Sequence, residues 1–186
     1  MFELGHLTRE MTEEALTPLV GLALTDFRQP IFTIFEFGEQ RPGKNRRGED
    51  VTFADWSFDI TGMSWQVVHH DRVVIGSSDM PYSGKRRPKR FFERITPPRD
   101  PELRSRWRAA NDFLDLVEAG SLHAVAVSAG PAGATSIFLE EGYAIHTFTD
   151  SSKATDLWTL QHRPTRESFW AEAKLNGLIA RKYELK

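Results

Sequence analysis

The stretch Ile31-Phe32-Thr33-Ile34-Phe35-Glu36-Phe37 consists almost entirely of β-branched and aromatic residues, and a Gln-Pro pair precedes it. Such runs, when bounded by turn formers, are typical of β-strands. The residues that follow, 39–50, are polar and include the turn formers Pro42, Gly43, Asn45 and Gly48, so we expect an exposed loop there. Residues 51–60 then alternate apolar and polar side chains, which predicts a second strand with Trp56 and Phe58 on one face.

Neighbouring segments complete a first β unit over residues 19–79. Residues 19–24 form a short apolar run that predicts another strand. Residues 65–68 and 73–75 predict a hairpin with its turn at residues 71–72.

A second β unit, residues 120–162, repeats this order, and its run Ser136-Ile137-Phe138-Leu139-Glu140 matches residues 33–36 in character. In both units 15 residues separate a leucine from the central isoleucine, and a histidine follows a tryptophan by four residues. The matched positions are Leu19 with Leu122, Ile34 with Ile137, Trp65 with Trp158, and His69 with His162. We therefore expect an α+β fold in which two related antiparallel β units pack as one pseudo-symmetric domain, residues 1–186.

Between the two units we expect a basic linker, residues 81–99, and a helix, residues 101–118. Prolines and a glycine make the linker irregular. Asp100 can cap the helix, Pro101 suits its first position, and Gly120 ends it. Apolar residues recur along the helix at spacings of three and four, which predicts one buried stripe. The stripe contains Leu103, Trp107, Ala110, Leu114 and Val117.

Short helices are also expected near both ends of the chain. Near the N-terminus, Thr8 or Thr12 can cap a helix that runs to Leu16, where Pro18 stops it. Near the C-terminus, the spacing of apolar residues predicts a helix over residues 165–180.

The composition limits the chemistry. The 186 residues include 24 Lys and Arg and 26 Asp and Glu, for a formal charge of −2. The absence of cysteine excludes disulfides, zinc–thiolate sites, iron–sulfur clusters and cysteine nucleophiles. No apolar stretch is long enough for a membrane span and the N-terminus does not resemble a secretory signal, so we expect a cytoplasmic protein without membrane contact.

No catalytic or metal signature is present. The sequence contains neither a glycine-rich phosphate loop nor a G-x-S-x-G elbow. His69 and His162 hold equivalent positions, but a metal site would need a third ligand such as Asp71. Asp59, Asp71 and Asp79 could do acid–base work only if two of them came within about 5–9 Å. We expect no catalytic residue, no metal and no cofactor.

The charge is unevenly distributed. Residues 85–108 carry ten basic and three acidic side chains, a net charge of +7, whereas the rest of the chain carries −9. Such asymmetry is typical of a surface for an anionic partner, although the segment can also fold back onto the acidic body. The candidate partner-binding residues are Lys85, Arg86, Arg87, Lys89, Arg90 and Arg94.

Three hypotheses for function follow. The first is an interaction protein that binds a protein partner without turnover. The second is a nucleic-acid-binding module that uses residues 85–108, where Phe91 and Phe92 lie beside the cations. The third is a small-ligand binder or hydrolase with a site between the two β units. A homodimer through an exposed edge strand is compatible with each of them.

The pattern also resembles a group of small uncharacterised bacterial β-rich proteins with two degenerate repeats, some of them in immunity-like gene contexts. The resemblance covers residues 19–160. It rests on Phe32-Thr33-Ile34-Phe35-Glu36-Phe37-Gly38-Glu39, Trp56-Ser57-Phe58-Asp59-Ile60, Trp65-Gln66-Val67, Gly76-Ser77-Ser78-Asp79 and Asp156-Leu157-Trp158-Thr159-Leu160. It implies a β-rich fold and an immunity-like or adaptor role, with no defined activity.

Overall fold

The computed structural model describes residues 2–28, 32–44, 47–77, 101–149, 155–174 and 177–184. Seven strands form one sheet: β1 (Phe2–His6), β2 (Leu24–Arg28), β3 (Thr33–Lys44), β4 (Asp50–Ile60), β10 (Thr155–His162), β11 (Glu167–Lys174) and β12 (Gly177–Glu184). Five strands form a second: β5 (Ser64–His69), β6 (Arg72–Gly76), β7 (Ala124–Ala129), β8 (Thr135–Leu139) and β9 (Tyr143–Phe148). The helices are α1 (Arg9–Leu16) and α2 (Pro101–Glu118), with short 3-10 turns η1 (Thr17–Leu19), η3 (Pro131–Gly133) and η4 (Glu140–Gly142).

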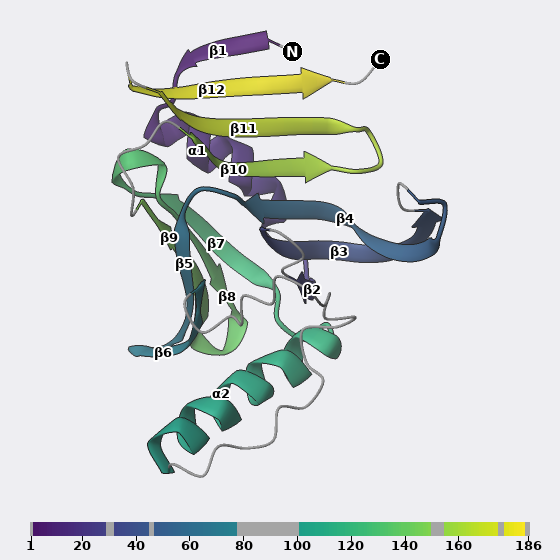
Figure 1. The fold of residues 1–186 in the computed structure, drawn as a ribbon, viewed down its shortest axis with the longest axis vertical. Coiled ribbons are helices and arrows are strands. Elements are labelled where there is room, and N and C mark those ends of the chain that lie inside the picture. Colours follow the sequence, from purple (N-terminus) through teal and green to yellow (C-terminus); the bar gives the residue numbers. More distant parts are fainter. Residues whose placement is uncertain are drawn as a thin grey trace.

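The two sheets exchange strands. The order is β1-β12-β11-β10-β4-β3-β2 in one sheet and β6-β5-β9-β8-β7 in the other, and all strand pairs are antiparallel (Figure 1). After β4 the chain leaves the first sheet and adds β5 and β6 beside β9. After β9 it returns and adds β10 and β11 beside β4. Each sheet therefore depends on both halves of the chain.

A bridge between Ala23 and His123 joins the starts of β2 and β7. The Leu24 N–H donates to the Leu122 carbonyl at 2.8 Å, and the Ala124 N–H donates to the Leu22 carbonyl at 2.9 Å. These reciprocal bonds satisfy backbone groups that would otherwise lie unpaired where the two sheets meet.

Two buried tryptophans anchor the core between the sheets. Trp65 packs edge-on against Phe27 and Phe35, with ring centroids 5.2 and 5.5 Å away, and its indole N–H donates to Thr33 Oγ1 at 2.7 Å. The indole N–H of Trp158 donates to the Gly133 carbonyl at 2.9 Å. Both indoles thus bury a large apolar area while their polar atoms remain bonded. Helix α2 packs against β2 and β6 at one end of the molecule (Figure 1).

The structure confirms the expected antiparallel β architecture and two of the three expected helices. Helix α2 spans the predicted residues 101–118, and Gly120 follows it with a φ of +63°. Helix α1 begins after Thr8, whose hydroxyl accepts a hydrogen bond from the Met11 N–H. In α2, Val117 is buried and Ala110 and Leu114 are partly buried, as the apolar stripe predicts, but the fully buried Phe113 was not part of the predicted stripe. The side chains of Leu103 and Trp107, the other two predicted members, lie outside the described part of the chain.

The expected C-terminal helix is wrong. Residues 167–174 and 177–184 form the strand pair β11–β12 instead, and Gly177 has a φ of +125°, which a helix does not allow. Side chains of β11 alternate with a period of two, so that Phe169 and Ala171 join the core cluster. Pairing with β10 and β12 outweighs the helical spacing of a few apolar residues. The strand β1, which pairs with β12, was not expected.

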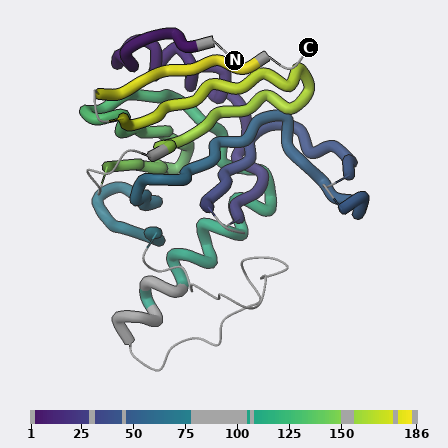
Figure 2. The backbone as a smooth tube through the Cα atoms, turned by 45° about the horizontal axis from the view of Figure 1, so that its top comes forward, coloured from purple at the N-terminus to yellow at the C-terminus, as the bar shows by residue number. Residues whose placement is uncertain are grey.

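The expected loop over residues 39–50 is mostly strand. β3 continues to Lys44 and β4 starts at Asp50, so that the hairpin projects beyond the rest of the sheet (Figure 2). Polar side chains face each other across the hairpin: Arg41 Nε lies 2.7 Å from Asp55 Oδ1, and Lys44 Nζ lies 2.9 Å from Asp50 Oδ1. The turn-forming composition of residues 39–50 therefore led to the prediction of a loop where the chain forms a strand pair with polar side chains.

Two boundaries also differ from expectation. The strand expected over residues 19–24 starts only at Leu24, because Pro18 lies in the 3-10 turn η1 and the chain bends after it. The turn between β5 and β6 contains His70 and Asp71, one residue earlier than expected, and His70 adopts a φ of +53°. No helix among the described residues is long and apolar enough to cross a membrane.

Candidate functional site

The predicted partner-binding residues Lys85, Arg86, Arg87, Lys89, Arg90 and Arg94 lie outside the described residues, as does Asp79. The basic binding surface therefore stays a prediction. His69 lies in β5 and His162 lies in β10, and these strands belong to different sheets, so the two histidines are not cross-strand neighbours. Within the described ranges no group of three His, Asp or Glu side chains is arranged to hold a metal ion.

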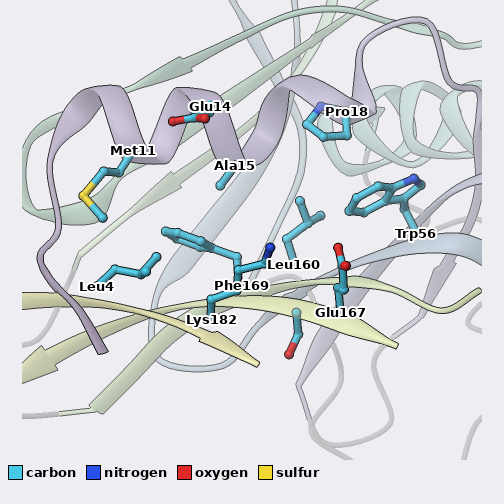
Figure 3. A pocket seen from close by; sticks show the side chains of 11 residues that line it. Leu4, Met11, Glu14, Ala15, Pro18, Trp56, Leu160, Glu167, Phe169 and Lys182 are labelled. Carbon is cyan, nitrogen blue, oxygen red and sulfur yellow. The ribbon is translucent and has the colours of Figure 1, made fainter. Parts of the chain in front are cut away.

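A groove of about 300 Å³ lies between α1 and the seven-stranded sheet (Figure 3). Its walls are mostly apolar, and charged side chains lie at its edge. The lining residues are Leu4, Met11, Glu14, Ala15, Pro18, Trp56, Leu160, Glu167, Ser168, Phe169 and Lys182. An apolar concavity with a few polar groups is the usual form of a small-molecule site.

Helix α1 forms one wall of the groove because its opposite side is fastened to β7. The Glu13 carboxylate accepts a hydrogen bond from the Ala129 N–H at 3.1 Å and another from Arg9 Nε at 2.9 Å, and these bonds lower the pKa of Glu13. On the groove side, Met11, Glu14 and Ala15 share one helix face, since they are three and four residues apart. The helix is thus held in place independently of any ligand.

Aromatic rings from the sheet form the other wall. Trp56 of β4 stacks on His162 of β10 with ring centroids 4.3 Å apart, and His162 Nδ1 lies 2.8 Å from Thr165 Oγ1. Phe169 of β11 stacks on the buried Trp158 at 5.6 Å. Stacking on a neighbouring ring therefore fixes the orientation of both Trp56 and Phe169, so this wall of the groove is preformed without a ligand.

The groove carries groups for binding rather than for catalysis. Glu14 lies on the helix side and Glu167 on the sheet side, while Lys182 is the one cation in the lining (Figure 3). The Ser168 hydroxyl accepts a hydrogen bond from Trp170 Nε1 at 3.0 Å, with no histidine in the lining to activate it as a nucleophile. The arrangement can hold an apolar body and a charged group.

A buried ionic cluster lies on the face of the seven-stranded sheet that points away from the core. The Glu36 side chain is fully buried, pairs with Arg28, and also pairs with Arg163 at 3.1 Å. Its second oxygen accepts a hydrogen bond from the Ala54 N–H at 3.2 Å. Arg163 Cζ lies 4.5 Å from the centroid of the Phe53 ring, so the projecting hairpin covers the cluster.

Asp59, two residues after Ser57 on β4, belongs to the same face and is only 7% exposed. Burial raises the pKa of Asp59 to about 6, and the Glu36 carboxylate adds to the effect, whereas Ser57, Arg163 and Arg28 oppose it. Burial also raises the pKa of Glu36 despite its two arginines. Asp59 was a carboxylate candidate from the sequence, but Asp71 lies in the exposed β5–β6 turn, away from the strands that carry Asp59 and Glu36.

Sequence reasoning did not find the groove. Its residues come from β1, α1, η1, β4 and β10–β12, and the sequence placed Trp56 only on one face of a strand. The one available signal was the spacing of Met11, Ala15 and Pro18 along a short helix. The chain matches no protein-family model, no curated protein and no solved structure.

Proposed function

We propose that this chain is a binding protein that takes a small cationic amphipathic molecule into the groove between α1 and the seven-stranded sheet, without chemical turnover. The observation that carries the proposal is a preformed apolar groove of about 300 Å³ with carboxylates on both sides. The proposal shares a small ligand with the third hypothesis from the sequence, but it places the site between α1 and the seven-stranded sheet rather than between the two β units.

The charge of the groove favours a cation. Two carboxylates, Glu14 and Glu167, stand against one ammonium group, Lys182. Trp56 offers an aromatic face, to which a cation is attracted. Both carboxylates would repel an anionic ligand, whereas the ammonium group of an amine would be attracted to at least one of them.

The volume of the groove limits the ligand's size. A groove of about 300 Å³ holds on the order of ten non-hydrogen atoms at the ~30 Å³ that a water occupies in the liquid. A ligand of this size, binding with ~0.5 kcal/mol per atom, reaches a Kd of roughly 0.2 mM. A substituted aromatic or aliphatic amine fits this description.

The proposal is tested with two probes of the same shape and opposite charge, phenethylamine and phenylacetate. We expect phenethylamine to shift the NMR signals of the Trp56 indole N–H and of Leu160 and Phe169 with a Kd near 0.2 mM, as estimated above, and phenylacetate to bind roughly tenfold more weakly. Equal binding of the two probes, or shifts confined to other surfaces, would contradict the proposal.

Matched variants test whether the carboxylates of the groove are responsible for the preference for an amine. Replacing Glu14 and Glu167 with glutamine is expected to weaken phenethylamine binding roughly fivefold and to leave phenylacetate binding equal or stronger. Glu10→Gln is the control, because Glu10 is an exposed acid on the same helix but does not line the groove. An equal loss in the control would mean that the overall field of the helix, rather than the groove, selects the amine.

We also propose that the two β units belong to diverged copies that extend beyond the predicted bounds 19–79 and 120–162, each copy consisting of a helix followed by five strands. The order α1 and β2–β6 parallels α2 and β7–β11, and the pairing of β4 with β10 parallels that of β9 with β5. Equivalent histidines support the proposal: His69 stacks on Tyr143 and His162 on Trp56, both with ring centroids 4.3 Å apart. The groove then lies where strands of the two copies meet.

A further inference from the structure

The outer face of the five-stranded sheet lacks charge. Arg72 is the only Asp, Glu, Lys or Arg residue in its five strands, all of which the structure describes, and it pairs with His69 at the end of the β5–β6 hairpin. The register turns Ile137 and Ile145 toward the core, so that Phe138, His146 and their neighbours face outward. The outer face of the other sheet carries Glu36, Asp59 and Glu172, so the absence of charge is not a general property of this fold.

Apolar side chains are exposed on this face. Phe138 is 39% exposed, Phe148 42% and Val73 39%. His146 lies between the two phenylalanines on β8 and β9: its Nδ1 is 2.8 Å from Ser136 Oγ, and its ring stands edge-on to Phe138 at 6.0 Å. Burial lowers the pKa of His146, which favours the uncharged ring.

We propose that this face, centred on Phe138, His146 and Phe148, binds a second copy of the chain and forms a two-fold symmetric dimer. A charged partner side chain laid against it would lose its water without gaining a counter-charge, so the face selects a partner surface that is itself uncharged. The outer face of the five-stranded sheet is such a surface, and a two-fold axis places it against itself. Two sheets stacked in this way lie ~10 Å apart with aligned strands, as in a β-sandwich.

The size of the face sets the expected affinity. Five strands spaced by ~4.8 Å, each five or six residues long at ~3.3 Å per residue, span roughly 24 by 18 Å. Two copies then bury on the order of 900 Å² in projection, which is below the ~1,200 Å² of stable interfaces and in the range of weak, transient ones. We therefore expect a dimer with a Kd of the order of micromolar, which forms and dissociates readily.

The test is sedimentation velocity across about 1 to 200 µM, a range that brackets micromolar dimers. We expect the wild type to shift from monomer to dimer within it, and Phe138→Lys and Ala126→Lys to stay monomeric. Ala126 is exposed on β7 and is not a member of the core cluster, so we expect its variant to test the face with little effect on the fold. Val20→Lys is the control, because Val20 is equally exposed but lies outside the sheet.

A wild type that remains monomeric throughout would overturn the proposal. So would a dimer that survives both lysine substitutions on the face, or one that Val20→Lys disrupts to the same extent. The groove lies on the seven-stranded sheet, so phenethylamine binding does not depend on whether the dimer forms. The failure of one proposal can therefore be distinguished from the failure of the other.

Discussion

Replacing Trp158 with alanine is expected to lower the free energy of unfolding by about 4 kcal/mol, within the range for large-to-small changes in a core. The Trp158 side chain is fully buried, and it contacts Phe58 and Phe169 with ring centroids 5.6 Å away in both cases. The substitution also leaves the Gly133 carbonyl without the indole N–H that bonds it at 2.9 Å. Urea unfolding followed by far-UV circular dichroism measures the change.

Two further variants separate packing from hydrogen bonding. Trp158→Phe keeps a six-membered aromatic ring but loses the rest of the indole with its N–H, so we expect a loss of about 2 kcal/mol, smaller than that of the alanine variant. Trp170→Phe is the control, because Trp170 is only partly buried on the outer face and bonds the nearby Ser168, and a loss of about 0.5 kcal/mol is expected. Equal losses for the two Trp→Phe variants would contradict the assignment of Trp158 as the anchor between the sheets.

Replacing Asp59 with asparagine is expected to stabilise the protein at pH 8 and to have little effect near pH 4. Burial raises the pKa of Asp59 to about 6, above its value in the unfolded chain, so the folded protein holds this proton more tightly. The stability gained from the protonated carboxyl is complete below about pH 4 and is lost as the pH rises through about 6. A shift of about two pKa units corresponds to roughly 3 kcal/mol, which asparagine would recover.

The pH dependence is measured by urea unfolding of wild type and Asp59→Asn between pH 4 and 8, a range that includes the folded-state pKa of about 6. Glu36 also has a raised pKa, but it is present in both proteins, so the difference between them isolates Asp59. Asp50→Asn is the control, since Asp50 is exposed and its pair with Lys44 contributes little. A difference that does not change with pH would show that Asp59 is not held in the buried state described here.

Much of the fold could be predicted from local pattern. Helix α2 was predicted at its observed bounds because a capping residue, a proline and an apolar stripe agree there. The strands around Phe35, Phe58 and Ile137 were predicted because β-branched and aromatic residues are bounded by turns. The exchange of strands between sheets could not be predicted, since β5 and β10 carry no sequence signal for which sheet they join.

The errors have a common physical cause. The β11–β12 pair and the outer half of the β3–β4 hairpin are stabilised by cross-strand partners rather than by their own composition. The groove was missed for a related reason: α1, β4 and β11 each contribute one or a few unremarkable side chains, and only the tertiary structure brings Met11, Trp56 and Phe169 together.

The most direct test of the proposed function is a crystal structure of the protein soaked with phenethylamine. The proposal predicts that the aromatic ring of the probe lies between α1 and the rings of Trp56 and Phe169, with its ammonium group directed at Glu14 or Glu167. A groove that stays empty while the probe binds elsewhere, or a probe whose ammonium group points away from both carboxylates, would contradict it.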